Sequence, residues 1–192
     1  MNPHATIVAG FGGQGLLFAG KVLAQAANLE DRHVTWMPSY GPEMRGGTAF
    51  CSVIIADRLI GSPIVDLADS VIALNPPSMA RFEPMLVAGG LLVLNSTLIE
   101  AEPRRTDIEI AALPCTALAR TAGHDQLVSI VALGALVARR PIVAVSSVRA
   151  ALTDLIGAKH PEFLEADLAA FEAGYAAASP AASTADVAVG VG

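Results

Sequence analysis

The chain has 192 residues, of which 53% are hydrophobic and 16% are charged, and its formal net charge is −6. This length is enough for one domain with a full core, and an acidic chain without a cluster of Lys or Arg argues against a nucleic-acid-binding protein. The two cysteines, Cys51 and Cys115, stand apart in apolar runs, so we expect small buried residues rather than metal or iron–sulfur ligands.

A glycine-rich turn follows the first apolar run. Thr6-Ile7-Val8-Ala9 leads into Gly10-Phe11-Gly12-Gly13-Gln14-Gly15, after which a helical spacing begins at Leu16. This order predicts a strand, a tight turn and a helix that runs to about residue 28. A helix that begins at such a turn directs unpaired N–H groups and the positive end of its dipole at a bound group, commonly a phosphate. We therefore predict cofactor contacts at Gly12, Gly13 and Gln14, the alternative being a tight turn without a ligand.

An ordinary NAD site also needs an acid about 20 residues further on, at the end of the second strand. The second strand is predicted at Val34–Met37 and ends in Pro38-Ser39, whereas Glu30 and Asp31 precede it. The acid is missing where it is needed, which argues against NAD binding.

Residues 38–47 hold two prolines and three glycines, which excludes a regular element. Arg45 could offer its guanidinium to a phosphate or a carboxylate, or it could be an exposed side chain paired with Glu43. Tyr40 and Met44 could contact a flat or thioester-bearing ligand, or serve in packing. The predicted ligand contacts in this loop are Tyr40, Met44, Arg45, Gly46 and Gly47.

Four more strands are predicted, at 48–55, 70–74, 91–94 and 108–113, with a Gly89-Gly90 turn before the third of these and the last at an edge of the sheet. The strand at 48–55 is placed inside the sheet, with Phe50, Ser52 and Ile54 on one face and Cys51, Val53 and Ile55 on the other. Asn75 and Asn95 end two strands. Each either caps a turn or contacts a ligand, and Asn75 is counted among the predicted cofactor-binding residues.

The later part of the chain reads as helical. Helices are predicted at 78–85, 114–121 and 126–138, from a cap at Ser146 or Ser147 to Gly157, and from Pro161 with Leu164, Leu168, Phe171 and Tyr175 on one face. His124-Asp125 is interpreted as a helix start with Asp125 as its cap rather than as a catalytic pair. Residues 1–177 are expected to form a single domain and 178–192 a flexible tail or partner-bound arm.

No segment resembles a signal peptide, and the longest apolar run, 126–138, is shorter than the roughly 20 residues of a membrane span. We therefore expect a cytoplasmic protein without a membrane partner.

Strands that alternate with helices predict an α/β fold, with a Rossmann-like, doubly wound and mostly parallel sheet and a helical C-terminal part. The glycine turn, the loop at 38–47, Asn75 and Asn95 all follow strands at their carboxyl ends. Ligands of such sheets bind at that edge.

Taken together, Gly10–Gly15 and Tyr40–Ala49 resemble one family, the gamma subunit of the 2-oxoacid:ferredoxin oxidoreductases. Within this family, the chain resembles gamma subunits of the 2-oxoglutarate type most. The similarity spans about residues 5–176 and continues through Leu133–Leu136. It implies a complex that converts a 2-oxoacid and coenzyme A to acyl-CoA and carbon dioxide, with two electrons passed to ferredoxin or, through a flavin subunit, to NAD. Thiamine diphosphate with Mg and the 4Fe-4S clusters would lie in alpha-, beta- and delta-type partner subunits, and no metal or catalytic residue is assigned to this chain.

The resemblance implies that the gamma subunit helps to bind coenzyme A as co-substrate and is not active alone. We expect 2-oxoglutarate or an aryl glyoxylate such as phenylglyoxylate as substrate rather than pyruvate. A stand-alone CoA- or nucleotide-binding module without catalysis is the main alternative, and an NAD-dependent dehydrogenase is less favoured. The high apolar content points toward subunit contacts.

Overall fold

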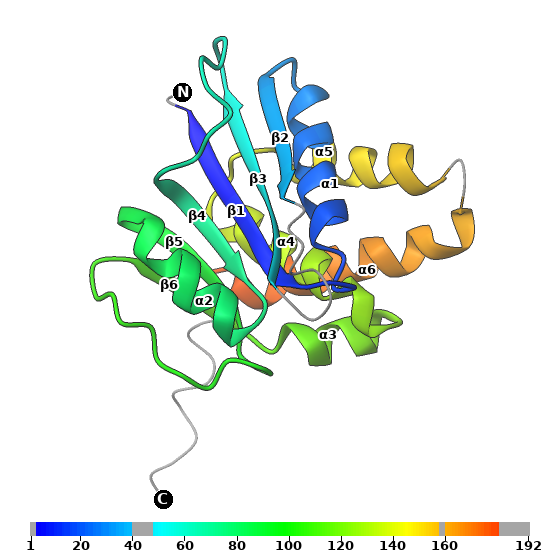
Figure 1. The fold of residues 1–192 in the computed structure, drawn as a ribbon. Coiled ribbons are helices and arrows are strands. Elements are labelled where there is room, and N and C mark those ends of the chain that lie inside the picture. The colour runs from blue at the N-terminus through cyan, green and yellow to red at the C-terminus, as the bar shows by residue number, and fades with distance from the viewer. Residues whose placement is uncertain (1–2, 40–47, 158–159, 181–192) are drawn as a thin grey trace, which may run out of the picture.

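The computed structural model describes residues 3–39, 48–157 and 160–180. Within these residues, six strands form one sheet in the order β2-β3-β1-β4-β5-β6 (Figure 1). The strands are β1 (His4–Phe11), β2 (His33–Ser39), β3 (Thr48–Ala56), β4 (Ala68–Ala73), β5 (Leu86–Asn95) and β6 (Glu109–Leu113). β3 runs antiparallel to both of its neighbours, β1 and β2, and the other described strands all run in one direction. The predicted α/β fold with a mostly parallel sheet is confirmed, including an internal β3 and β6 at an edge.

Helices cover both faces of the sheet. They are α1 (Leu16–Asn28), α2 (Pro76–Phe82), α3 (Cys115–Ala122), α4 (Val128–Arg139), α5 (Val145–Leu152) and α6 (Pro161–Ala178), with short 3-10 turns η2 (Glu83–Met85) and η3 (Asp125–Leu127) and a π-helical turn η4 (Thr153–Gly157). The larger core cluster joins one face of the sheet to α1 and to α3–α6, and the smaller cluster joins the other face to α2. In Figure 1, α2 lies in front of the sheet and α4 behind it.

The two faces of β3 divide as the alternation predicts. Cys51, Val53 and Ile55 enter the larger cluster, and Phe50 packs against the smaller one. Cys51 and Cys115 are both buried, and burial raises the pKa of each thiol to about 12. Both are therefore small core residues, as predicted, and their raised pKa values make the thiols unreactive.

Two predicted boundaries are wrong. Gly89-Gly90 is not a turn before a strand but a bulge inside β5, where the register with β4 shifts and Gly89 adopts a φ of +73°. The helix α5 begins at Val145, before the two serines expected to cap it, and its N-cap residue Ala144 has no capping side chain. The carboxylate of Glu30 accepts the Ala144 N–H instead, at 2.7 Å, so a residue from the turn after α1 fixes this helix start.

The core-facing side of α6 is rotated relative to the predicted stripe. Phe171 is fully buried as expected, whereas Leu164, Leu168 and Tyr175 are only partly buried. The buried residues of α6 are Asp167, Ala170, Phe171, Gly174 and Ala178. An acid therefore stands on the inward side of this helix.

Glycines let α4 and α6 pack backbone to backbone. A Cβ at Gly134 would meet the main chain of Phe171 and Tyr175, and a Cβ at Gly174 would meet that of Val131. Backbone cannot move aside as the end of a side chain can, so only glycine fits at this crossing. The contact sets how closely α6 approaches the rest of the core.

We predict that Gly134→Ala lowers the free energy of unfolding by at least about 2 kcal/mol, because an added methyl must separate two helix backbones. Urea unfolding of purified protein measures the change. Gly61→Ala is the matched control, since a Cβ there has open space and should change stability by less than about 0.5 kcal/mol. An unchanged unfolding midpoint for Gly134→Ala would contradict the backbone contact.

Candidate functional site

The glycine turn lies at the carboxyl edge of the sheet, where β1, β2 and β5 end. Because β3 is antiparallel, it begins at this same edge, with Thr48 opposite Phe11 and Phe50 opposite Ser39. The residue after the segment 40–47 therefore lies beside the glycine turn, and the residue before it, Ser39, ends β2 one strand further along the same edge. Tyr40, Met44, Arg45, Gly46 and Gly47 lie outside the described residues, so their ligand contacts stay predictions.

The turn leaves the start of α1 open. Gly15 is the N-cap of α1 with a φ of +74°, and no side chain caps the helix. Gln14 folds back instead, and its Oε1 accepts the Phe11 N–H at 2.6 Å. This oxygen occupies the space that a Cβ at Gly10 would need. Gly12 and Gly13 are exposed. The first-turn N–H groups of α1 thus keep the positive end of the helix dipole available for an anion.

The position of β3 explains why no ribose-binding acid is expected after β2. In this sheet β3 separates β2 from β1, so the end of β2 lies two strand spacings, about 10 Å, from the strand that carries the glycine turn. A side chain at Pro38 or Ser39 is therefore not placed as the acid of an ordinary dinucleotide site would be.

The two strand-end asparagines serve local turns. The Oδ1 atom of Asn75 accepts the Ser78 N–H at 2.8 Å and so caps α2. The Nδ2 atom of Asn95 donates to Thr116 Oγ1 at 2.9 Å, and its Oδ1 accepts the N–H groups of Thr97 and Thr116. Both side chains are buried. The capping alternative thus describes both, and the ligand contact predicted for Asn75 stays untested.

A pocket of about 350 Å³ opens beside the glycine turn. Gly15 and Phe18 contribute from α1, Ile130 from α4, Ile156 from η4 and Asp167 from α6. The N-termini of α1 and α4 meet at this point, since a Cβ at Gly15 would lie 2.8 Å from both Gln126 O and Ser129 Oγ. Segments far apart in sequence therefore build one hollow around the start of α1.

Among the described residues that line this pocket, Asp167 is the one acid, and no sequence motif pointed to it. The residue is 6% exposed, and no hydrogen bond joins its carboxylate to another described residue. Burial raises the pKa of Asp167 to about 6, against an opposing effect of His124. The only sequence signal was a single acid close to Ala170 and Phe171 on an otherwise apolar face.

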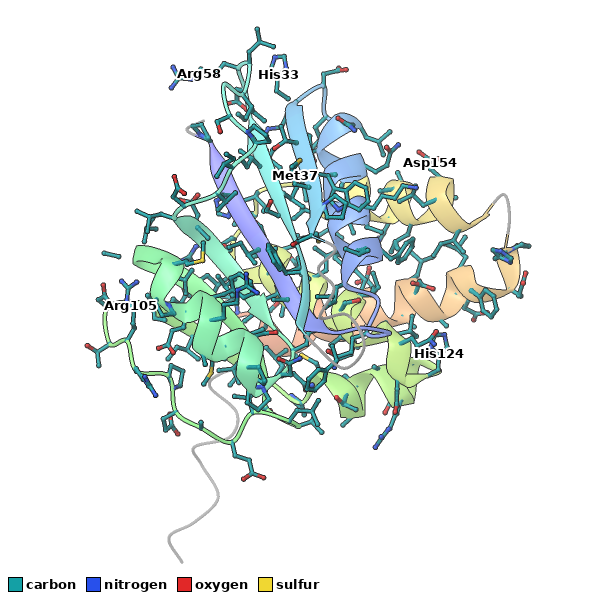
Figure 2. The ribbon with its side chains drawn as sticks, in the orientation of Figure 1. His33, Met37, Arg58, Arg105, His124 and Asp154 are labelled. Carbon is teal, nitrogen blue, oxygen red and sulfur yellow. The ribbon has the colours of Figure 1, made fainter. Side chains whose placement is uncertain are left out.

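His124 lines the same pocket and projects from the segment between α3 and α4 (Figure 2). The predicted cap at Asp125 is wrong, because its carboxylate pairs with the Arg120 guanidinium at 2.6 and 3.0 Å instead. The Arg120 hydrogen bond lowers the pKa of Asp125. The hydrogen-bond partner of Asp125 is therefore Arg120 and not His124.

The opposite face of the sheet carries exposed apolar side chains. Met37 is 46% exposed and lies over the strands in Figure 2, and Ile64 is 71% exposed on the connection after β3. Both line a hollow of about 360 Å³ with Phe50, over which the Arg81 guanidinium stacks at 5.0 Å. Apolar surface of this kind is typical of a protein–protein contact.

No group of three or more His, Cys, Asp or Glu side chains in the described ranges could hold a metal ion. The two described cysteines are far too few for a cluster that needs about four thiolates. The described residues do not fit an iron–sulfur centre. Likewise, no described helix is long and apolar enough to cross a membrane.

Comparison with known families gives a match over residues 5–177 to the family described as pyruvate ferredoxin/flavodoxin oxidoreductase. The chain is 42% identical over 131 residues to ketoisovalerate oxidoreductase subunit VorA of Methanothermobacter thermautotrophicus, covering 68% of this chain and 27% of that protein. It is 34% identical over 174 residues to 2-oxoglutarate synthase subunit KorC of the same organism, covering 87% of this chain and 90% of KorC.

Among solved structures, the gamma subunit of a keto/oxoacid ferredoxin oxidoreductase from Geobacter sulfurreducens superposes with a TM-score of 0.80 at 30% identity, covering 91% of this chain and 98% of that one. The chain spans about a quarter of the length of VorA but nearly all of KorC. The shared unit is therefore a whole subunit in one relative and part of a longer chain in the other.

We predict that Asp167→Asn stabilises the protein more at pH 8 than at pH 4.5. Because the pKa of Asp167 is raised to about 6 in the folded protein, the stability linked to its proton is fully present below about pH 4 and is lost as the pH rises through 6. Asparagine removes the buried charge present at pH 8. The difference between the two pH values should be on the order of 1 to 3 kcal/mol, measured by urea unfolding.

The control for this measurement is Asp154→Asn, which changes an exposed acid on η4 (Figure 2). Its effect should be within about 0.5 kcal/mol at both pH values. Equal effects of Asp167→Asn at pH 4.5 and pH 8 would show that this carboxylate is well solvated in the folded protein.

Proposed function

This chain belongs to the pyruvate ferredoxin/flavodoxin oxidoreductase family, and we propose that it works as the gamma subunit of a multi-subunit 2-oxoacid:acceptor oxidoreductase and is not active alone. The observation that carries this proposal is the match over residues 5–177 together with similarity along nearly all of KorC. Complexes of this family use coenzyme A, thiamine diphosphate and iron–sulfur clusters. The reaction is the oxidative decarboxylation of a 2-oxoacid with coenzyme A to acyl-CoA and carbon dioxide.

Coenzyme A binding is the part we assign to this chain. The start of α1 has no capping side chain and suits a phosphate group. Gly12 and Gly13 allow close approach of a ligand to the backbone, and Gln14 holds the turn closed. We place Arg45 and its neighbours Tyr40, Met44, Gly46 and Gly47 at this edge because their segment joins the end of β2 to the start of β3, which lies beside the turn.

The partners are alpha-, beta- and delta-type subunits, which carry the thiamine diphosphate, magnesium and 4Fe-4S clusters. Assembly is supported by the exposed apolar residues on the sheet face around Met37 and Ile64. Residues 1–177 make up the gamma domain, and 178–192 form an arm that a partner can order. Ferredoxin receives the electrons, or NAD through an additional flavin subunit.

The substrate is a 2-oxoacid, for which pyruvate is the less favoured candidate. The relatives named for 2-oxoglutarate and for ketoisovalerate share 34% and 42% identity with this chain. They favour 2-oxoglutarate or a branched-chain 2-oxoacid, and an aryl glyoxylate such as phenylglyoxylate is a further member of this class. The partner subunits shape the pocket that makes this choice.

Isolation of the native protein tests the assembly. We expect a tagged chain to copurify with thiamine-containing and iron–sulfur subunits, and the complex to oxidise a 2-oxoacid only when coenzyme A is present. The separated chain should bind coenzyme A weakly and turn over no oxoacid. Recovery of a lone chain without such partners would favour a stand-alone binding module instead.

We predict that Arg45→Ala in the complex raises the KM for coenzyme A by about tenfold, the cost of one charge-assisted hydrogen bond to a phosphate. The KM for the oxoacid should change by less than about twofold, within the error of such comparisons. Steady-state kinetics measures both values. Arg58→Ala is the control, because Arg58 follows β3 at the other edge of the sheet (Figure 2). An unchanged KM for coenzyme A would remove Arg45 from the proposed site.

A further inference from the structure

The pocket beside the glycine turn contains an acid that is largely buried and that accepts no hydrogen bond from the described residues. Asp167 is 6% exposed and lines the pocket, and the described residues offer it no hydrogen bond. A buried ionised carboxylate is costly unless donors satisfy it. Its remaining exposure faces a hollow that could admit such a donor.

The walls restrict what that donor can be attached to. Phe18, Ile130 and Ile156 are apolar, and Phe163 lies at the opening beside His160, with the two ring centroids 5.7 Å apart. A small, strongly hydrated ammonium ion would leave these walls uncovered. A flat aromatic group with an N–H edge covers them and satisfies the carboxylate at the same time.

The charge and the volume of the pocket indicate a ligand with two parts, an anionic group outside the pocket and an uncharged group inside it. The Asp167 carboxylate repels a phosphate from the pocket itself, whereas the open start of α1 at Gly15 attracts one to its mouth. A volume of about 350 Å³ lies at the small end of ordinary ligand pockets and suits a base with its sugar rather than a whole carrier. An anion-binding helix start beside a pocket with apolar walls and one hydrogen-bond-accepting carboxylate is the arrangement that a nucleotide fits.

We propose that this pocket binds the aminopurine base of a phosphorylated nucleotide carrier, with the exocyclic amine donating a hydrogen bond to Asp167 and the phosphates directed at the start of α1. The inference rests on the proposed function, in which that carrier is coenzyme A. His124 and His160 border the base at the edge of the pocket. Asp167 is thus a specificity-determining residue for the base.

The test compares two ligands that differ only in the base, each with the wild-type complex and with the Asp167→Asn complex. The probes are coenzyme A and its deaminated analogue, in which a hypoxanthine carbonyl replaces the adenine amine. Wild-type complex should show a KM for the analogue about tenfold higher, because a carbonyl oxygen then faces a carboxylate. In Asp167→Asn the preference should fall below about twofold, since a carboxamide can donate to the carbonyl.

Asp154→Asn is the matched control and should keep the full preference, since this exposed acid is not among the residues that line the pocket. Urea unfolding at pH 8 establishes that Asp167→Asn is folded, and the KM for the oxoacid should be unchanged. Equal KM values for the two probes in the wild type, or an undiminished preference in Asp167→Asn, would overturn the inference while leaving coenzyme A as co-substrate. Oxoacid turnover that needs no coenzyme A would overturn the proposed function as well.

Discussion

The close crossing of α4 and α6 is the contact on which the candidate site depends. Gly134 and Gly174 remove the side chains that would hold the two backbones apart. Without those side chains, α6 packs close enough to α4 to bury Phe171 completely and to bring Asp167 to the pocket around the start of α1. The candidate site takes residues from α1, α4 and α6, so its geometry is fixed only if the distances between these helices are fixed. Contact between two backbones fixes such a distance firmly, because neither backbone can move aside.

The antiparallel strand β3 determines which segments lie at the carboxyl edge of the sheet. Inserting β3 between β1 and β2 removes the usual place for a ribose-binding acid and brings the start of β3, which follows the 40–47 segment, beside the glycine turn. The same edge that is poorly suited to an ordinary dinucleotide is therefore supplied with a second glycine-rich segment. This arrangement agrees with a subunit that holds part of a large co-substrate and leaves the redox chemistry to partners.

The pocket shows a conflict between stability and ligand binding. Asp167 occupies an inward position of α6, where an apolar residue of similar size would pack without the cost of a buried charge. The other acid that is buried among the described residues, Glu83, has a hydrogen-bond partner, because its carboxylate accepts the Arg105 N–H at 2.7 Å. A carboxylate kept without such a partner is a feature that ligand binding accounts for and packing does not.

The sequence by itself determined the local elements of this protein. The strand, turn and helix around Gly10–Gly15, the six strands and the burial of both cysteines follow from periodicity and from turn residues that are neighbours along the chain. Tertiary structure alone decided the antiparallel direction of β3, the bulge at Gly89 and the place of Asp167, because each depends on which distant segment lies opposite. An acid on a helix reads the same in a sequence whether it faces water or a pocket, and only the packing of α6 against α4 distinguishes the two.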